Sequence, residues 1–343
     1  MKYFFLLLVL SGNLLAYEFH DSHFHLTNYI QEGPSAREFL KIMGDKVGRS
    51  ALFGIPLQQQ WSERISGKNA PKYYLDTDAH LYYYSFTDAL IAKEYLSLSP
   101  LEQKRFDPMI TGFNPTDMYA VDHIKRVLKT FPGVFTGIGE FTIHKEFVSS
   151  KVAGDIASLK DKSLDLILDF AAEAGLIVIL HNDFHAPFPK EGDEPVFFRQ
   201  IKELFRRHPQ TTIIWAHTGL GRVIQPMGDH IRALERILRE PAMKNVYFDI
   251  SWSEVAKYIN HSEESLTKAA NLFDKFPDRF LFGSDEVASR ESEKYFKIYN
   301  DYEALWKKVK PETASKMKLK NYERIFDHAR LKVRAWEAKN ALH

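Results

Sequence analysis

The sequence predicts an α/β protein that folds as a closed barrel of eight parallel strands with helices between them, the (β/α)8 or TIM barrel. Between residues 19 and 284 it contains eight short apolar runs, and amphipathic helical stretches separate most of them. The runs show little polar alternation, as expected of parallel strands that are covered on both faces. An open doubly wound sheet is the alternative, but its phosphate-binding pattern Gly-x-Gly-x-x-Gly is missing.

The elements follow one another in a regular order. Strands are expected at residues 19–23, 50–55, 109–113, 134–139, 176–180, 212–216, 246–250 and 280–282. Helices are expected at 116–130, at 162–174, which Gly175 ends, and at 226–239, beyond which Pro241 lies. The helix at 162–174 has an apolar stripe made of Leu164, Ile167, Leu168, Ala171 and Ala172.

Two segments depart from the barrel pattern. Residues 56–86 form a long insertion after the second strand, with no clean period and many Gln and Tyr residues. Loops that follow barrel strands rise from the catalytic face, so we expect a lid or pocket wall there; the alternative is a locally folded insertion with its own small aromatic core. Residues 311–343 are expected to form extra C-terminal helices, which could supply a homodimer interface. Apart from these additions, residues 17–343 are expected to form a single barrel domain.

The first 16 residues have the pattern of an export signal peptide. Lys2 gives a positive start, residues 3–10 are mostly apolar, and Ala16 is a small residue at a plausible cleavage point. The apolar run is too short to anchor the chain in a bilayer. We therefore expect a free, soluble product that is periplasmic or secreted. The alternative is that residues 3–15 form a buried strand or plug at the bottom of the fold.

Composition excludes several classes of function. The formal net charge of +1 predicts no strong attraction to nucleic acid or to a membrane surface. The chain has no cysteine, which excludes thiolate metal sites, disulfides and a cysteine nucleophile. The expected partner is therefore a small molecule.

The ends of the predicted strands carry six side chains that can bind a metal. His23 and His25 follow the first strand, and alternate residues of a strand point the same way about 6.5 Å apart. The fourth, fifth, sixth and eighth strands lead to Glu140, His181, His217 and Asp285. In a barrel these ends meet on one rim, so we expect a single metal site. Each residue alone also has a structural interpretation, such as a hydrogen-bonded histidine or a helix N-cap carboxylate.

Three motifs carry a resemblance to a known family: Asp21-Ser-His-Phe-His-Leu26, Ala216-His-Thr-Gly219 and Phe282-Gly-Ser-Asp285. With them the sequence resembles the amidohydrolase superfamily of metal-dependent barrels, and more narrowly its amidohydrolase-related branch, over nearly all of residues 17–300.

The resemblance implies roles for the six residues. It makes His23, His25, His181 and Asp285 metal ligands or catalytic groups, and His217 a ligand or an acid–base group. Glu140 is similar to the bridging carboxylate of TatD-like deoxyribonucleases and related two-metal barrels, whereas many single-metal relatives have no acid there. One ion and two ions are therefore both compatible with the sequence.

The residue types also indicate a mechanism. Imidazole and carboxylate ligands without sulfur suit zinc, and also manganese, iron or nickel. Water bound to zinc ionises near neutral pH, which gives a metal-bound hydroxide as nucleophile. We expect Asp285 to act as the base, and His217 to polarise the scissile carbonyl or to act as the acid. Arg222 could grip a substrate carboxylate or phosphate, or form a salt bridge; Trp252 could line the pocket or pack under a loop.

Several functions are compatible with this site. The first is hydrolysis of a C–O, C–N or P–O bond in a lactone, amide or ester. The second is metal-dependent decarboxylation, which the resemblance also implies, and Glu140 favours the first. A TatD-like nuclease is disfavoured by the near-neutral charge. A barrel that binds a ligand without turnover is disfavoured by the presence of all six residues.

Overall fold

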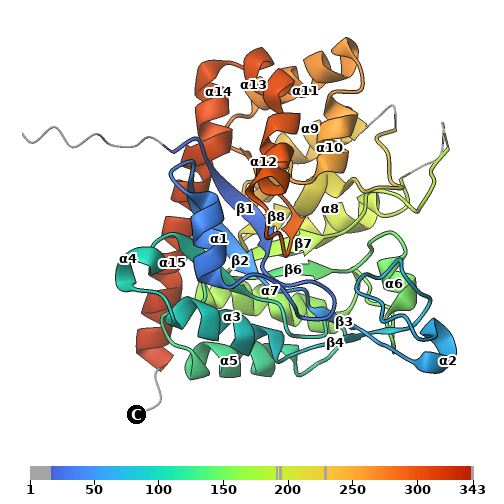
Figure 1. Ribbon diagram of the computed structural model, residues 1–343. Helices are drawn as coiled ribbons and strands as arrows, with labels where there is room; N and C mark the ends of the chain where they lie inside the picture. The colour runs from blue at the N-terminus through green and yellow to red at the C-terminus, as the bar shows by residue number, and fades with distance from the viewer. Residues whose placement is uncertain (1–16, 191, 193–194, 228–229, 341–343) are drawn as a thin grey trace, which may run out of the picture.

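The computed structural model describes residues 17–190, 192, 195–227 and 230–340 (Figure 1). The signal peptide expected at residues 1–16 lies outside the described residues. None of the described helices is both long and apolar enough to cross a membrane.

Eight parallel strands form the barrel, and every predicted strand is among them. They are β1 (Phe19–His25), β2 (Val47–Phe53), β5 (Phe106–Ile110), β6 (Gly137–Thr142), β7 (Ile177–His181), β8 (Ile213–Trp215), β9 (Val246–Asp249) and β10 (Phe280–Leu281). Neighbours pair in this order, and the short strand β11 (Glu286–Val287) pairs with the free side of β1. The ring closes there, because the main-chain N–H of Ser22 donates to the carbonyl of Phe282 at 3.1 Å. The predicted TIM barrel is confirmed.

Strand β6 differs from the prediction in a way that affects Glu140. The strand continues to Thr142, so Glu140 lies inside it and not after it. The pairing of β6 with β7 shifts register between Ile138 and Phe141. Gly139 lies at this irregularity with φ of 114°, and a Cβ there would lie 2.2 Å from the carbonyl oxygen of Ile179. Only glycine fits such a close approach, and the bulge re-aims the side chain of Glu140.

Helices cover the outside of the barrel and its lower end. They are α1 (Ala36–Met43), α3 (Thr87–Leu96), α4 (Pro100–Gln103), α5 (Ala120–Thr130), α6 (Val148–Lys151), α7 (Lys162–Ala174), α8 (Phe198–Arg207), η1 (Ala216–Gly219), α9 (His230–Leu238), η2 (Pro241–Met243), α10 (Ser253–Ile259), α11 (Glu263–Lys275), α12 (Ser292–Asp301), α13 (Glu303–Lys308), α14 (Pro311–Ser315), η3 (Lys316–Lys320) and α15 (Asn321–Asn340).

The three predicted helices correspond to α5, α7 and α9. Helix α7 has the predicted bounds, and Gly175 ends it in the left-handed region with φ of 76°. Helix α5 begins at Ala120 and not at 116, because the side chains of Asn114 and Asp117 accept main-chain hydrogen bonds and form turns before it. Helix α9 is described from His230 to Leu238.

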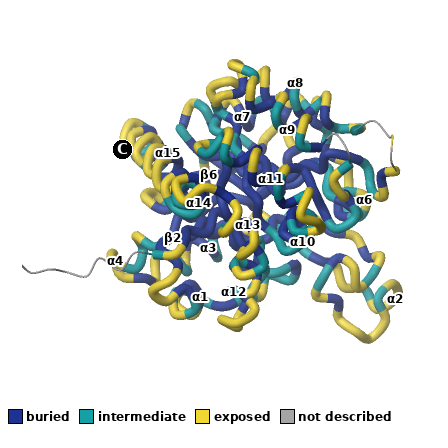
Figure 2. The backbone as a smooth tube through the Cα atoms, turned by 90° about the horizontal axis from the view of Figure 1, so that it is seen from above, coloured by how far each residue is buried: buried dark blue, intermediate teal, exposed yellow. Residues whose placement is uncertain are grey.

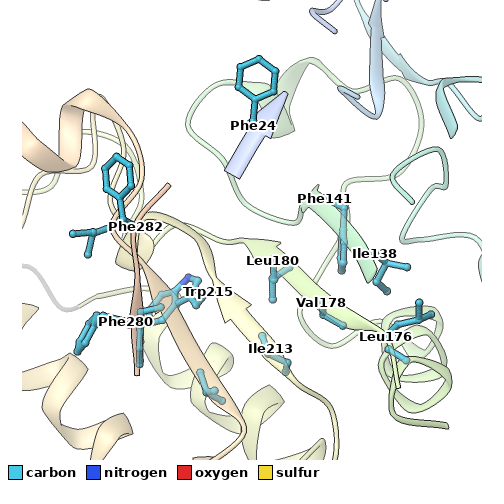
Figure 3. Close-up of a cluster of buried hydrophobic side chains, with 14 of the residues drawn as sticks. Phe24, Ile138, Phe141, Leu176, Val178, Leu180, Ile213, Trp215, Phe280 and Phe282 are labelled. Carbon is cyan, nitrogen blue, oxygen red and sulfur yellow. The ribbon is translucent and has the colours of Figure 1, made fainter. Parts of the chain in front are cut away.

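Alternate residues of each strand face two different cores. In β7, Val178 and Leu180 belong to the core beneath the helices (Figure 3). Ile177 and Ile179, which alternate with them, belong to the cluster inside the barrel. Helix α15 closes the lower end of the barrel, where its residues Tyr322, Ile325, Phe326 and Ala329 join the interior cluster. The hydroxyl of Tyr322 donates to Asp107 of β5 at 2.8 Å. The opposite end of the barrel is left free for a site.

The insertion at residues 56–86 is a folded unit. Its strands β3 (Leu57–Gln59) and β4 (Leu81–Tyr83) form an antiparallel pair, and α2 (Glu63–Ser66) lies between them. Tyr74 and Leu57 belong to a small core that also contains Tyr29 from the loop after β1. The loops around α2 project from the body with exposed residues (Figure 2). The aromatic base of the insertion is thus tied to the upper end of the barrel.

Candidate metal centre

His23 and His25 lie at the carboxyl end of β1 with their ring centroids 5.3 Å apart. Both side chains are buried. Among the described residues, Nε2 of His23 and Nδ1 of His25 have no hydrogen-bond partner. A buried polar atom without a partner is costly, whereas the lone pair of a neutral imidazole is a metal ligand.

Asp285 reaches both histidines from the loop between β10 and β11. Its Oδ1 lies 3.2 Å from Nε2 of His25 and 3.3 Å from Nε2 of His23. The backbone of Asp285 has φ of 52°, a region that is unfavourable for a residue with a side chain. Asp21 holds the loop, because its carboxylate accepts from the main-chain N–H of Ser284 at 2.8 Å and from its hydroxyl at 2.6 Å.

Glu140 lies on the other side of the same space. Its Oε1 is 2.6 Å from Nδ1 of His181 and 3.3 Å from Nε2 of His217. The same oxygen is 3.7 Å from Nε2 of His23, which links it to the first strand. The six side chains predicted from the strand ends therefore converge on one small volume.

Within the described part of the chain, two groups of three donors could each hold an ion. They are His23, Glu140 and His217, and His23, His25 and Asp285. His181 belongs to neither group; its Nε2 lies 3.1 Å from Oδ1 of Asp183, and its Nδ1 lies 2.6 Å from Oε1 of Glu140.

Sequence reasoning missed Asp249, which orients two of these side chains. Its Oδ2 accepts a hydrogen bond from Nδ1 of His23 at 3.0 Å, and its Oδ1 accepts the main-chain N–H of His217 at 2.9 Å. Ser251 contributes its hydroxyl, which lies 2.9 Å from Nδ1 of His217. The signal was present, since Asp249 is a carboxylate at the end of the seventh barrel strand.

Lys145 is a second residue that was missed. Its Nζ lies 3.4 Å from Oε2 of Glu140, and only 11% of its side chain is exposed. It comes after β6, in a loop where no strand pattern marks it.

The ionisable groups of the site shift one another's pKa values. Burial raises the pKa of a carboxyl group, but at Asp285 His217 and His23 outweigh burial and hold the pKa below its usual range. Lys145 and His181 likewise outweigh burial and hold the pKa of Glu140 well below its usual range. Burial lowers the pKa of an imidazole, but Asp249 and Asp285 outweigh it and raise the pKa of His23 to about 9.

These observations fit a divalent cation. The donors are imidazole nitrogens and carboxylate oxygens, the types that bind zinc and similar metals. The unpartnered Nε2 of His23 faces the carboxylates of Asp285 and Glu140. An ion among these three side chains would satisfy a nitrogen that has no other partner.

A cavity of about 220 Å³ opens above the donors. His25, Asp285 and Lys145 lie on its lining, together with the predicted substrate-binding residues Arg222 and Trp252. A larger, mostly apolar cavity of about 360 Å³ lies beside α9, α10 and α11, but none of the six predicted site residues lines it. The smaller cavity is therefore the one that the chemistry points to.

Arg222 is held in place by the insertion. Its Nη1 donates to the hydroxyl of Tyr74 at 3.2 Å, and its Nη2 donates to that of Tyr73 at 3.1 Å. Its guanidinium carbon lies 5.6 Å from the ring centroid of Trp252. Glu146 accepts the main-chain N–H of Arg222 and lies 3.8 Å from its Nη1. Both interpretations of Arg222 from the sequence, a salt bridge and a pocket cation, are thus compatible with its position.

Comparison with known proteins gives a family match and a set of similar folds. The sequence matches the family model described as amidohydrolase over residues 101–327. No curated protein matches the sequence.

Three solved structures share the fold. An uncharacterised TIM-barrel protein from Bordetella bronchiseptica has a TM-score of 0.53 at 16% identity, covering 90% of this chain and 99% of its own. A Pseudomonas putida protein described as a 2-pyrone-4,6-dicarboxylic acid hydrolase has a TM-score of 0.53 at 13% identity, covering 91% and 98%. A 2,6-dihydroxybenzoate decarboxylase from Rhizobium has a TM-score of 0.51 at 13% identity, covering 91% and 99%.

Proposed function

The chain belongs to the amidohydrolase family, and from this premise we propose that it is a metal-dependent hydrolase of a small organic anion. We propose that it cleaves a C–O, C–N or P–O bond of a lactone, amide or ester. One observation carries the proposal: the Asp285 carboxylate faces Nε2 of both His23 and His25 at the cavity.

His23, His25 and Asp285 would hold the ion, with Glu140 and His217 on its other side. Zinc fits this set of nitrogen and oxygen donors best, and manganese, iron or nickel are alternatives. A divalent ion there supplies Lewis acidity, which lowers the pKa of a water molecule or polarises a carbonyl oxygen.

The protein side chains do the proton transfers. Asp285 lines the cavity, so a water molecule that enters can donate a hydrogen bond to its carboxylate. Asp285 takes the proton of the attacking water and passes it to the leaving group. His217, which Ser251 and Asp249 orient, polarises the scissile carbonyl or acts as the acid.

Cationic and aromatic groups around the cavity select the substrate. Arg222 and Lys145 present positive charge, and Trp252 and Tyr73 offer aromatic faces. A guanidinium fork binds a carboxylate in two-pronged fashion. The substrate we propose is a flat molecule with a carboxylate, small enough for about 220 Å³.

Decarboxylation is the second candidate, and the same cations favour it because a substrate of that reaction carries a carboxylate by definition. We rank it second because the Asp285 carboxylate lines the cavity, where it can take a proton from a water molecule. Mature enzyme loaded with zinc or manganese should open the ring of carboxylated lactones, and a chelator should abolish this. Release of carbon dioxide from hydroxybenzoates without any hydrolysis would reverse the ranking.

We also propose the protein's location and assembly from the sequence. Export rests on residues 1–16, and N-terminal sequencing of the natural product should begin at Tyr17. The absence of a basic surplus supports small-molecule substrates over nucleic acid. A homodimer through residues 311–343 is tested by light scattering.

A further inference from the structure

We propose that Lys145 is a built-in cation that takes the place of a second metal ion on Glu140, so that the site holds a single ion. The inference rests on the proposed function, because it concerns how many ions the same site holds. It assigns a role to a buried lysine that neither holds the ion nor forms part of the predicted ligand set.

The ammonium group is fixed beside the carboxylate. Nζ of Lys145 lies 3.4 Å from Oε2 of Glu140, and its side chain is 11% exposed. Its backbone is anchored, because its N–H donates to Oγ of Ser149 at 2.9 Å and that hydroxyl donates to the carbonyl of Ile143 at 3.1 Å. The ammonium group of Lys145 therefore lies against Glu140 at this wall of the cavity.

Both oxygens of Glu140 are already engaged by positive or hydrogen-bonding partners. Oε1 faces Nδ1 of His181 at 2.6 Å and Nε2 of His217 at 3.3 Å, and Oε2 faces Lys145. A metal bound to Oε2 at the usual distance of about 2.1 Å would lie no more than about 5.5 Å from the ammonium nitrogen. Like charges that are this close in a buried site repel strongly.

His181, the other ligand that a second ion would need, is also committed. Its Nδ1 faces Glu140, and its Nε2 lies 3.1 Å from Oδ1 of Asp183. Asp183 is fixed in turn, because its Oδ2 accepts the main-chain N–H of Glu146 at 2.6 Å. Each ring nitrogen of His181 is therefore within hydrogen-bond distance of a carboxylate oxygen, and neither is left facing the space where an ion would sit.

The contrast with His23 marks the position of the single ion. Among the described residues, Nε2 of His23 has no hydrogen-bond partner, although it faces Asp285 at 3.3 Å. Both metal-competent groups in the described part of the chain include His23, and neither includes His181. Nε2 of His23 lies 3.7 Å from Oε1 of Glu140, whereas the ammonium of Lys145 lies 3.4 Å from Oε2, which Nε2 of His25 also faces at 3.6 Å.

The test is the metal content of the full mature chain, measured by elemental analysis after loading with excess zinc or manganese and removal of free ions. Wild type should retain about one ion per chain, whereas Lys145→Met should retain about two, as in two-metal sites, because Glu140 loses its counter-charge. Lys145→Arg, which keeps the charge, should retain about one. Lys294→Met is the matched control, because Lys294 lines the same cavity but pairs with Glu286 at 2.9 Å, and it should also retain one.

Anomalous scattering from crystals of loaded wild type locates the ions without any substitution. One peak between His23, His25 and Asp285, with Lys145 still on Glu140, is the expected result. Two peaks in wild type, or a Lys145→Met variant that folds and still holds one ion, would overturn the proposal. Wild type that holds no ion under any loading condition would contradict the proposed function itself, and is thereby distinguished from a wrong ion count.

Discussion

Asp249 binds His23 through a buried hydrogen bond of 3.0 Å between Oδ2 and Nδ1. Because this bond commits one ring nitrogen, it turns the other, Nε2, toward Asp285 and Glu140. The second oxygen of the same carboxylate accepts the main-chain N–H of His217 at 2.9 Å. A single side chain at the end of β9 therefore sets the direction of two predicted site residues from different strands.

Asp249→Asn tests this orienting role. The amide keeps the shape of the carboxylate but loses its charge, so His23 becomes a weaker and less well oriented ligand. Loss of such a supporting carboxylate typically weakens metal binding by about 10- to 100-fold. Competition with a chelating dye measures the affinity. Asp155→Asn, at an exposed position, is the control and should leave the affinity unchanged. Equal affinities for the two variants would show that Asp249 does not orient the site.

The barrel could be predicted because strand periodicity is a local property of the sequence. Each apolar run, such as the one before His181, supplies both faces of a covered strand, so the run itself identifies the strand in the sequence. The ends of elements were less predictable, because tertiary contacts decide them. Glu140 lies inside β6 because pairing with β7 continues to Thr142, and no signal in the residues of β6 alone marks that end.

The convergence of the six predicted side chains could be anticipated because the strand ends of a barrel meet on one rim, and their binding of a metal stays a prediction. Their partners could not be predicted, since a hydrogen bond such as that from Arg222 to Tyr73 joins residues 149 positions apart. No sequence pattern marked Lys145 as a site residue either. It lies in a loop, and only the fold brings its ammonium to Glu140.

Arg222→Met should weaken the use of substrates that carry a carboxylate. Charge-assisted hydrogen bonds contribute about 1.5–3 kcal/mol, so kcat/KM should fall by about 10- to 150-fold, chiefly through KM. For a neutral ester of the same substrate, kcat/KM should fall less in this variant, because the ester has no carboxylate for Arg222 to bind. Arg290→Met, outside the cavity lining, is the control. A fall confined to kcat would mean that Arg222 does not act by binding the substrate carboxylate.

Tyr73→Phe should produce a smaller effect of the same kind. The change removes the hydroxyl that accepts from Nη2 of Arg222 at 3.1 Å and leaves the ring in place. A neutral hydrogen bond contributes about 0.5–1.5 kcal/mol, so KM should rise by about 2- to 10-fold. Tyr83→Phe, on the same insertion but outside the cavity lining, should leave KM unchanged. Equal KM values for both variants would mean that the insertion does not position Arg222.

Ser284→Ala should lower the free energy of unfolding by about 1–3 kcal/mol, because it leaves part of the buried Asp21 carboxylate without a donor. The hydroxyl of Ser284 donates to Oδ2 of Asp21 at 2.6 Å and joins β1 to the loop that carries Asp285. Urea denaturation measures the change. Ser150→Ala removes an exposed hydroxyl and should change stability by less than about 0.5 kcal/mol. A similar loss of unfolding free energy in both variants would mean that the hydrogen bond between Ser284 and Asp21 does not stabilise the contact between β1 and the loop that carries Asp285.

His230 should make stability depend on pH. It is buried, its Nε2–H donates to the carbonyl of Thr218 at 2.9 Å, and burial lowers its pKa to about 4. In the unfolded chain its pKa is about 6.5, so above that pH both states hold it neutral and its contribution is complete. As the pH falls from about 6.5 to about 4, only the unfolded state takes up the proton, and up to about 3 kcal/mol of stability is lost.

Urea denaturation between pH 7.5 and pH 4.5 measures this slope, and His230→Gln should flatten it because the amide stays neutral and still donates. The slope should not vanish in that variant, because burial also lowers the pKa of His144 to about 4. His261→Gln replaces an exposed histidine and should keep the wild-type slope. If His230→Gln lost stability with falling pH as steeply as His261→Gln, the buried imidazole of His230 would not be the group that takes up the proton on unfolding.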